Sequence, residues 1–409
     1  MPSSAMVFPR YAWLLAIAVP ISGSDEAAWK RLWETKRCFE LAEARPQGLY
    51  EGLAAAVFHD EAKAVDVLEW VIRQRPQSAD ALLAHNQLLY LHQRAGRMGK
   101  ALAHLRAMAS SPALKRGSLG GAAALFEAFA GLPDLRVTNA RKVSSTFERD
   151  DEGLWIPIQV GGKSTKAFLD TGANFSMISR QLAQSLGVPL VGGRVESETT
   201  TTQKAVMQLA ALPALDVAGL RVENNAALVL DDEAQPFSGW PIERRLVLGL
   251  PVILSLGAWT FSNNGSLRID PSPAPLAEKP NLCFSGATPL LEGMYQGKRL
   301  LFAFDTGAGR LDLWVNFYRA FRAQVDREGK RRTVTVGGVG GNQEFPGKRL
   351  PRVQIHVSGV PVLFADVDVL TRHSIADSRL LDGRAGRDVF NAAAAFTIDF
   401  RRMQVSLSR

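Results

Sequence analysis

The chain has 409 residues, of which 46% are hydrophobic and 22% charged, and this composition excludes a disordered or collagen-like protein and leaves room for two or three domains. The formal net charge is +8, but the basic residues are spread along the chain, and the densest run is the short segment 330–332. Nucleic-acid-binding proteins concentrate such charge on one face, so we expect a solvated basic surface and no nucleic-acid partner, although an anionic membrane or cell-wall surface would suit this charge.

The first 24 residues have the pattern of an export signal. Arg10 precedes an apolar run from Tyr11 to Ile21, and small residues follow at 22–24. This order of basic, apolar and small residues is typical of a secretory signal peptide, and the run is too short to span a bilayer comfortably. We therefore predict a signal peptide over residues 1–24 and an exported protein, periplasmic or extracellular. An N-terminal membrane anchor and a buried helix are the alternatives.

Residues 25–133 have the apolar periodicity of an α-helical domain. A helical hairpin is predicted over 54–75, and Ser78 is predicted to cap a second pair of helices over 79–94 and 99–108. Two tandem helix pairs loosely resemble tetratricopeptide repeats, which bind protein partners. The other interpretation is a generic helical domain that packs on the rest of the chain. Its role as a pro-segment, a docking domain or a cover of a cleft is left open.

The chain contains two cysteines, Cys38 and Cys283, which form neither a disulfide framework nor a zinc knuckle. They can pair only if the fold brings their Cα atoms within about 7 Å. We expect two unpaired structural cysteines, because a chain of this size does not need one bridge over so long a loop. His85 and His92 lie seven residues apart on one helical face, where a structural role is expected rather than metal binding. No metal or cofactor is expected.

After residue 133 the pattern changes to short β-branched or alternating runs between glycine-rich turns, which is typical of strands. A proline-rich stretch at 271–281 is predicted to be an exposed linker. It divides the region into 150–270 and 282–409. Each part has an early apolar strand, a later glycine beside an apolar segment, and a closing pair of hairpin-like strands. We therefore predict an internal duplication of a β-rich unit.

The strongest signal is a repeated tetrapeptide, Asp-Thr-Gly-Ala, which follows an apolar strand at 170–173 and again at 305–308. A given tetrapeptide occurs by chance in about one of a hundred chains of this length. An aspartate at the end of a buried strand is costly unless it is hydrogen-bonded, and the glycine lets the backbone turn closely beside the carboxylate. The threonine hydroxyl can bond to the other half of the molecule. The predicted site residues are Asp170 and Asp305 as the reacting pair, and Thr171, Gly172, Thr306 and Gly307 as supports of the two loops.

Two aspartates that face each other share one proton, because adjacent like charges resist joint ionisation. The ionised member can take a proton from a water molecule held between them, and the protonated member can donate to a scissile carbonyl oxygen. This chemistry hydrolyses a peptide bond without a covalent intermediate. The sequence contains no His-Glu-x-x-His zinc motif, and no Gly-x-Ser segment in the context of a nucleophile elbow.

The repeated motif resembles that of the retropepsin-type aspartic peptidases, in which two β-rich lobes each supply one catalytic aspartate. The resemblance covers about residues 150–409. It implies an all-β bilobal domain of two β-barrel-like lobes, here preceded by an α-helical domain and joined in one chain as in pepsin-like enzymes, so that a monomer suffices for catalysis. It also implies an apolar-apolar-Gly segment late in each lobe. Segment 247–249 fits, whereas segment 384–386 places an arginine in an apolar position. Flexible flaps are predicted at 198–203 and 336–342.

The sequence therefore predicts an aspartic endopeptidase that acts on a peptide or protein substrate. A catalytically silent peptide-binding relative and a scaffold that recruits partners through its helices are the alternatives. Both motifs retain Asp, Thr and Gly, which favours the enzyme because a silent copy commonly loses one of them. The substrate, the cleavage preference and the working pH are not predicted.

Overall fold

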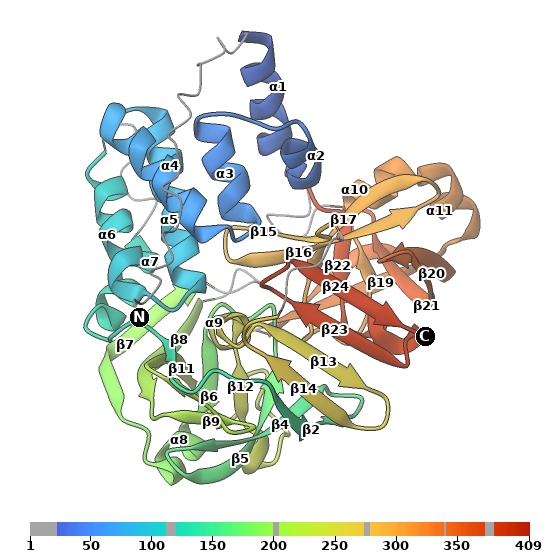
Figure 1. The fold of residues 1–409 in the computed structure, drawn as a ribbon. Helices are drawn as coiled ribbons and strands as arrows, with labels where there is room; N and C mark the ends of the chain where they lie inside the picture. Colours follow the sequence, from blue (N-terminus) through green and yellow to red (C-terminus); the bar gives the residue numbers. More distant parts are fainter. Residues whose placement is uncertain (1–22, 112–119, 199–203, 274–278, 339–340, 373–379) are drawn as a thin grey trace, which may run out of the picture.

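The computed structural model describes residues 23–111, 120–198, 204–273, 279–338, 341–372 and 380–409. A helical region, blue to teal in Figure 1, lies at one end of the molecule above two β-sheet regions. The predicted signal peptide lies outside the described residues except for its last two, which begin the first helix. In the described part of the chain, no helix is long and apolar enough to cross a membrane.

The helices of the N-terminal region are α1 (Gly23–Glu34), α2 (Cys38–Glu43), α3 (Leu49–Val57), α4 (Glu61–Gln74), α5 (Ala79–Arg94), α6 (Met98–Ala109) and α7 (Gly120–Phe129). Short helices occur between the strands that follow. They are α8 (Arg180–Leu186), α9 (Leu250–Ser255), α10 (Val315–Ala320), α11 (Arg322–Glu328) and the 3-10 helices η1 (Ile242–Arg244) and η3 (Arg387–Ala392).

Capping side chains determine where the long helices begin. The Asp60 side chain accepts the Lys63 N–H and starts α4, and the Ser78 hydroxyl accepts the Ala81 N–H at 3.0 Å and starts α5. Each bond satisfies one of the N–H groups that a helix leaves unpaired at its start. The predicted cap at Ser78 is therefore confirmed. Helix α3 packs on α4, and α5 packs on α6, as expected of two helix pairs.

The described strands form three sheets, which we call the N-terminal, bridging and C-terminal sheets. The N-terminal sheet contains β1 (Arg136–Val137), β3 (Glu148–Arg149), β4 (Leu154–Val160), β5 (Lys163–Leu169), β6 (Ser176–Ser179), β7 (Leu190–Glu198), β8 (Lys204–Leu212), β9 (Leu215–Val217), β10 (Leu220–Glu223), β11 (Asn225–Leu230) and β12 (Leu246–Leu248). The bridging sheet contains β2 (Val143–Thr146), β13 (Ala258–Ser262), β14 (Ser266–Asp270), β23 (Ala395–Asp399) and β24 (Gln404–Ser408). The C-terminal sheet contains β15 (Leu282–Ser285), β16 (Thr288–Tyr295), β17 (Lys298–Phe304), β18 (Asp312–Leu313), β19 (Lys330–Gly338), β20 (Gly341–Val357), β21 (Val360–Leu370) and β22 (Gly383–Ala385).

The same strand arrangement occurs at the centre of the N-terminal and C-terminal sheets. Strand β5 pairs in parallel with β12, and β17 pairs in parallel with β22. Strand β12 then pairs antiparallel with β6, as β22 does with β18. The first strand of each parallel pair ends in three buried residues directly before an aspartate. Parallel strands buried on both faces are nearly continuous in apolar residues, which explains the run that precedes each motif.

The bridging sheet joins the two halves of the β region. Strand β13 pairs antiparallel with β23 in a continuous register from Ala258↔Asp399 to Ser262↔Ala395. The Thr260 and Thr397 hydroxyls meet at 2.9 Å on one face of this pair. The sequence predicted the two hairpins β13–β14 and β23–β24 separately, and the structure shows that they form one sheet.

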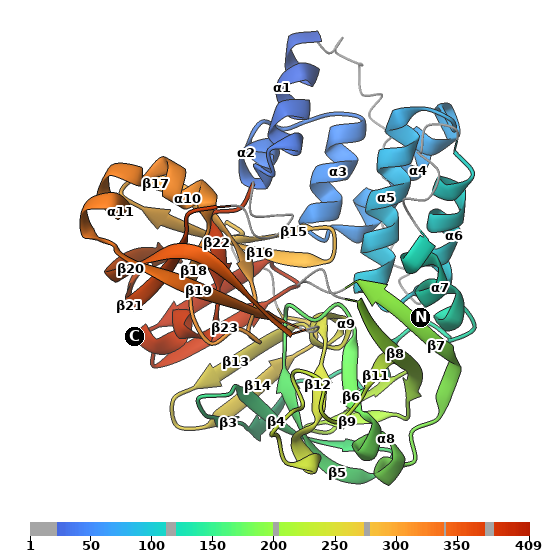
Figure 2. The same ribbon diagram turned by 180° about the vertical axis from the view of Figure 1, so that it is seen from behind.

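The helical region contacts both halves of the β region, and Figure 2 shows it from behind above the same two regions. On the N-terminal side, Phe129 of α7 stacks on Phe175 within a buried apolar cluster, with ring centroids 5.7 Å apart. On the C-terminal side, the buried Arg94 of α5 donates to the Gly286 and Ala56 carbonyls and lies 4.1 Å from the centroid of the Phe284 ring.

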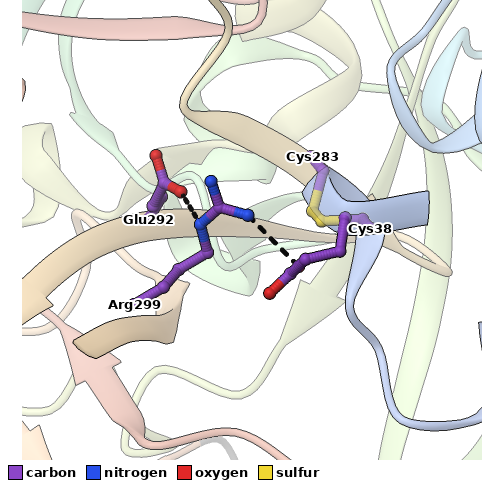
Figure 3. Close-up of a disulfide and its surroundings, with 5 residues drawn as sticks. Cys38, Cys283, Glu292 and Arg299 are labelled. Atoms are coloured by element: carbon purple, nitrogen blue, oxygen red, sulfur yellow. Dashed lines mark ion pairs between the residues drawn. A yellow bond between two sulfur atoms is a disulfide. The ribbon is translucent and has the colours of Figure 1, made fainter. Parts of the chain in front are cut away.

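The expectation of two unpaired cysteines is wrong. Cys38 of α2 and Cys283 of β15 form a disulfide, with Cα atoms 6.8 Å apart. Figure 3 shows this bond beside Arg299, which forms ion pairs with Glu292 of β16 and with Glu40 of α2. The sequence could not indicate the pairing, because it depends on how α2 docks on a strand 245 residues away.

Candidate active site

Asp170 and Asp305 follow the ends of β5 and β17 at the junction of the N-terminal and C-terminal sheets. The backbone N–H of Asp170 donates to the Leu248 carbonyl at 3.1 Å, and that of Asp305 donates to the Ala385 carbonyl at 3.0 Å. Each loop is therefore held by the strand that pairs in parallel with it. The two carboxyl groups lie close together, because a Cβ placed on Gly172 would lie 2.7 Å from Asp305 Oδ1 and 3.2 Å from Asp170 Oδ1. The structure thus brings together the two aspartates that the repeated tetrapeptide singled out.

Backbone N–H groups hold one oxygen of each carboxyl. Gly172 N–H donates to Asp170 Oδ1 at 2.8 Å. Gly307 and Ala308 N–H donate to Asp305 Oδ1 at 2.9 and 3.2 Å. Such bonds fix the orientation of a carboxyl and favour its charged form. Of the second oxygens, Asp170 Oδ2 faces Gly307 of the other loop, and Asp305 Oδ2 faces Arg384 Nη1 at 3.6 Å.

The two threonines bind the loops to each other. Thr171 Oγ1 donates to the Phe304 carbonyl at 3.0 Å and accepts the Thr306 N–H at 3.0 Å. Thr306 Oγ1 donates to the Leu169 carbonyl at 2.8 Å and accepts the Thr171 N–H at 3.0 Å. Both threonines are fully buried. These four reciprocal bonds are the hydroxyl contacts between halves that the sequence predicted.

There is no room for a side chain at the glycine of either motif. A Cβ at Gly172 would lie 2.7 Å from Asp305 Oδ1, and a Cβ at Gly307 would lie 2.7 Å from Asp170 Oδ2. Both distances are shorter than any ordinary carbon–oxygen contact. Each glycine therefore lies against the carboxyl of the other half, which shows how closely the two loops approach.

The environment favours one shared proton. Burial, followed by the neighbouring charge of Asp305, raises the pKa of Asp170 well above its usual range. The Asp305 side chain is about one-fifth exposed, at 22%. Two carboxyls in contact cannot both ionise cheaply, and their titration belongs to the pair.

A charged pair beside Asp305 was not predicted in this form. Arg384 of β22, which the sequence marked as a departure from an apolar position, is opposite Asp312 of β18 in the antiparallel register. Its Nη2 lies 2.5 Å from Asp312 Oδ2, and its Nη1 lies 3.6 Å from Asp305 Oδ2. The sequence signal for this contact was the arginine itself, but the partner could be found only from the strand pairing.

Arg387 was missed entirely by the sequence interpretation. Its guanidinium donates to the Gly307 carbonyl in the C-terminal motif and to the Asp151 carbonyl near the start of β4. Arg387 is buried and so ties the loop of Asp305 to the N-terminal half. The sequence signal that could have identified Arg387 is its position directly after Gly386, the glycine late in the C-terminal half.

Of the flaps predicted at 198–203 and 336–342, residues 199–203 and 339–340 lie outside the described residues. Their described arms are the hairpins β7–β8 and β19–β20, paired up to Glu198↔Lys204 and Gly338↔Gly341. Among the described residues, no group of three or more histidine, cysteine, aspartate or glutamate side chains could hold a metal ion. His85 and His92 lie in the helical region, where the ring of each contacts the ring of His104. All three histidines are far from the two aspartates in the sequence.

Comparison with known proteins supports one part of this assignment. The family model described as Aspartyl protease matches residues 156–252. This segment contains the Asp170 motif, β12 and the start of α9. No curated protein matches the chain. The β region with its curled sheets and N-terminal helices fits an aspartic-protease-like fold, and the match suggests aspartic peptidase activity.

Proposed function

We propose that this protein is an aspartic endopeptidase, with the N-terminal and C-terminal sheets as its two lobes and Asp170 and Asp305 as its catalytic pair. The observation that carries the proposal is the reciprocal bonding of two Asp-Thr-Gly loops from different halves of one chain. This bonding holds the two carboxyls close together, since one Cβ position on Gly172 would lie 2.7 Å from Asp305 Oδ1 and 3.2 Å from Asp170 Oδ1. A purely structural core has no need to bury like charges together, because such burial is costly.

The geometry supports hydrolysis by an activated water. One carboxylate of the pair takes a proton from the water, and the water oxygen bonds to the carbonyl carbon of the peptide. The protonated carboxyl gives its proton to the carbonyl oxygen, which becomes a hydroxyl. Collapse of this intermediate returns a proton to the amide nitrogen and breaks the C–N bond. The products are a carboxyl and an amine, and the pair regains its single proton.

The helical region is a fixed part of the proposed enzyme. Support comes from its buried contacts with both halves, through Phe129 on one side and Arg94 on the other, and from the Cys38–Cys283 disulfide. A disulfide persists in oxidising compartments, which also supports the proposal that residues 1–24 direct export. A fusion of residues 1–24 to a reporter that is active only after export tests this point.

A peptide-library cleavage profile across a range of pH tests the proposed activity. We expect cleavage of internal peptide bonds, loss of cleavage with a statine-containing peptide inhibitor, and no effect of a metal chelator. Asp305→Asn is the matched inactive control, since it replaces one carboxyl by an amide of the same shape. Cleavage that is unchanged in this variant would assign the activity to another site or to a contaminant.

The profile also separates the enzyme from a silent relative. A protein that binds library peptides and releases them uncut, with its fold intact by circular dichroism, would have a binding role only. Binding measured on the Asp305→Asn variant provides the reference for uncut peptide. The preferred residues on each side of the cut would come from the same data.

A further inference from the structure

The surroundings of the two aspartates differ, although the strands that carry them are arranged alike. In the N-terminal sheet, Val247 is opposite Met177 between β12 and β6. Both side chains belong to a buried apolar cluster with Trp155. The equivalent pair in the C-terminal sheet is Arg384 opposite Asp312. An apolar pair beside one aspartate is thus replaced by an ion pair beside the other.

The guanidinium of Arg384 connects two carboxyls. Its Nη2 lies 2.5 Å from Asp312 Oδ2, and its Nη1 lies 3.6 Å from Asp305 Oδ2. Because Asp312 holds one edge of the planar group, the other nitrogen is directed toward Asp305. The Arg384 side chain is only 24% exposed, so water screens this interaction less than it would on an open surface.

Arg384 keeps its positive charge in this position. Burial disfavours the cation, but Asp312, Asp305 and, least of the three, Asp170 outweigh that effect and raise the pKa of Arg384. Burial also raises the pKa of Asp312, against the opposing effect of Arg384. As the pH falls, Asp312 therefore becomes neutral more readily than an exposed aspartate.

Other charges lie around this site, and one is the Asp388 carboxyl of η3, which accepts the Leu311 N–H at 2.9 Å and interacts with Asp312 and Arg387. Arg387 is a second cation on the Asp305 side, held by the Gly307 and Asp151 carbonyls. Beyond Asp312, the carboxyl of Asp368 is paired with two further cations. These are Arg349 at 2.9 Å and Arg332 at 3.4 Å. In the described part of the chain, no ion pair joins Asp170 to a cation.

We propose that Arg384 is a positioning residue that holds Asp305 as the ionised member of the catalytic pair, so that the shared proton resides on Asp170. This inference rests on the proposed peptidase function. Asp305 is then the base that takes the proton of the water as its oxygen bonds to the carbonyl carbon, and Asp170 donates its proton to the carbonyl oxygen. In the second half of the reaction, Asp305 passes its proton to the amide nitrogen while Asp170 recovers one from the hydroxyl, and the C–N bond breaks.

The pH dependence of kcat/KM tests this role. The acid limb reports the first ionisation of the pair in the free enzyme. A nearby positive charge favours ionisation, so removing it should move the limb to higher pH, by about one unit or more. For Arg384→Gln we therefore expect about a tenfold loss of kcat/KM at a pH on the wild-type acid limb. Arg384→Lys, which keeps the charge, should restore most of the wild-type profile.

A matched control uses a cation of the same network that does not reach the catalytic pair. Arg332 pairs with Asp368, and Arg332→Gln should leave the acid limb unchanged within about 0.2 units. A merely structural role of Arg384 would lower activity equally at all pH values. An acid limb in Arg384→Gln that coincides with that of the wild type would overturn the inference.

A second variant tests the same role in case Arg384→Gln does not fold. The double change Arg384→Val with Asp312→Met copies the apolar pair Val247 and Met177 of the N-terminal sheet. Replacing a buried ion pair by apolar residues of suitable volume is often neutral for stability. This variant should fold and should shift the acid limb upward like Arg384→Gln. A folded double variant with the wild-type limb would again contradict the role of Arg384.

Carbon NMR of the aspartate carboxyls separates this inference from the proposed function. The signals of the pair can be assigned with Asp170→Asn and Asp305→Asn and titrated in wild type and Arg384→Gln. An upward shift of the titration in protein that cleaves no peptide would retain the inference about the proton and remove the peptidase proposal. Cleavage by wild type with no shift in Arg384→Gln would do the reverse.

Discussion

Loss of the Thr171 hydroxyl tests whether the two loops support each other. Thr171→Val keeps the shape of the side chain but removes the donor to the Phe304 carbonyl and the acceptor of the Thr306 N–H. Both bonds are buried, and each buried group left without its partner costs about 1–3 kcal/mol. We therefore expect a loss of about 2–6 kcal/mol in the free energy of unfolding.

The matched control is Thr171→Ser, which keeps the hydroxyl and loses one methyl, at a cost of about 1 kcal/mol. Urea unfolding followed by circular dichroism measures both variants. The valine variant should also lose about tenfold or more in kcat, because the loop that carries Asp305 is no longer held in place. If Thr171→Val and Thr171→Ser unfold at the same urea concentration with equal kcat, the reciprocal bonding does not support the site as described.

Two further predictions concern the helical region. Reduction of the Cys38–Cys283 bond, or the Cys38→Ser change, should lower the free energy of unfolding by about 3–5 kcal/mol, because the bond closes a loop of 245 residues; equal urea midpoints with and without reductant would contradict this. Burial lowers the pKa of His92 and the pKa of His104 to about 4 each, against about 6.5 in the unfolded chain. The second cause is a neighbouring histidine, which is His104 for His92 and His85 for His104. Because the unfolded chain binds the protons more readily, this stability is fully present above about pH 6.5 and is lost as the pH falls toward 4. The melting temperature of His92→Gln should therefore fall less steeply between these pH values than that of the wild type, and parallel curves would refute the assignment.

The features that the sequence could predict depend on residues that are close together in the chain. The repeated motif identified Asp170 and Asp305 because each copy follows its own apolar strand. The start of α5 followed from Ser78, whose hydroxyl accepts an N–H three residues later. These features depend on local hydrogen bonding and on apolar runs, which a single sequence displays directly.

Features that depend on docking between distant segments could not be predicted. The Cys38–Cys283 bond requires α2 to lie against β15. The pairing of β13 with β23 requires two hairpins from different halves to meet. Arg384 was recognised only as a residue out of place, because its partner Asp312 precedes it by 72 residues and becomes its neighbour through the β18–β22 pairing.

A double-mutant cycle on the catalytic pair is the most direct test of the account. It compares kcat/KM for wild type, Asp170→Asn, Asp305→Asn and the double variant on one peptide from the library. If the carboxyls act as one unit, each single change should abolish cleavage about as completely as the double change, since effects within a catalytic unit are not additive. Additive losses, or a single variant that cleaves at the wild-type rate while remaining folded, would show that the two aspartates do not share the reaction.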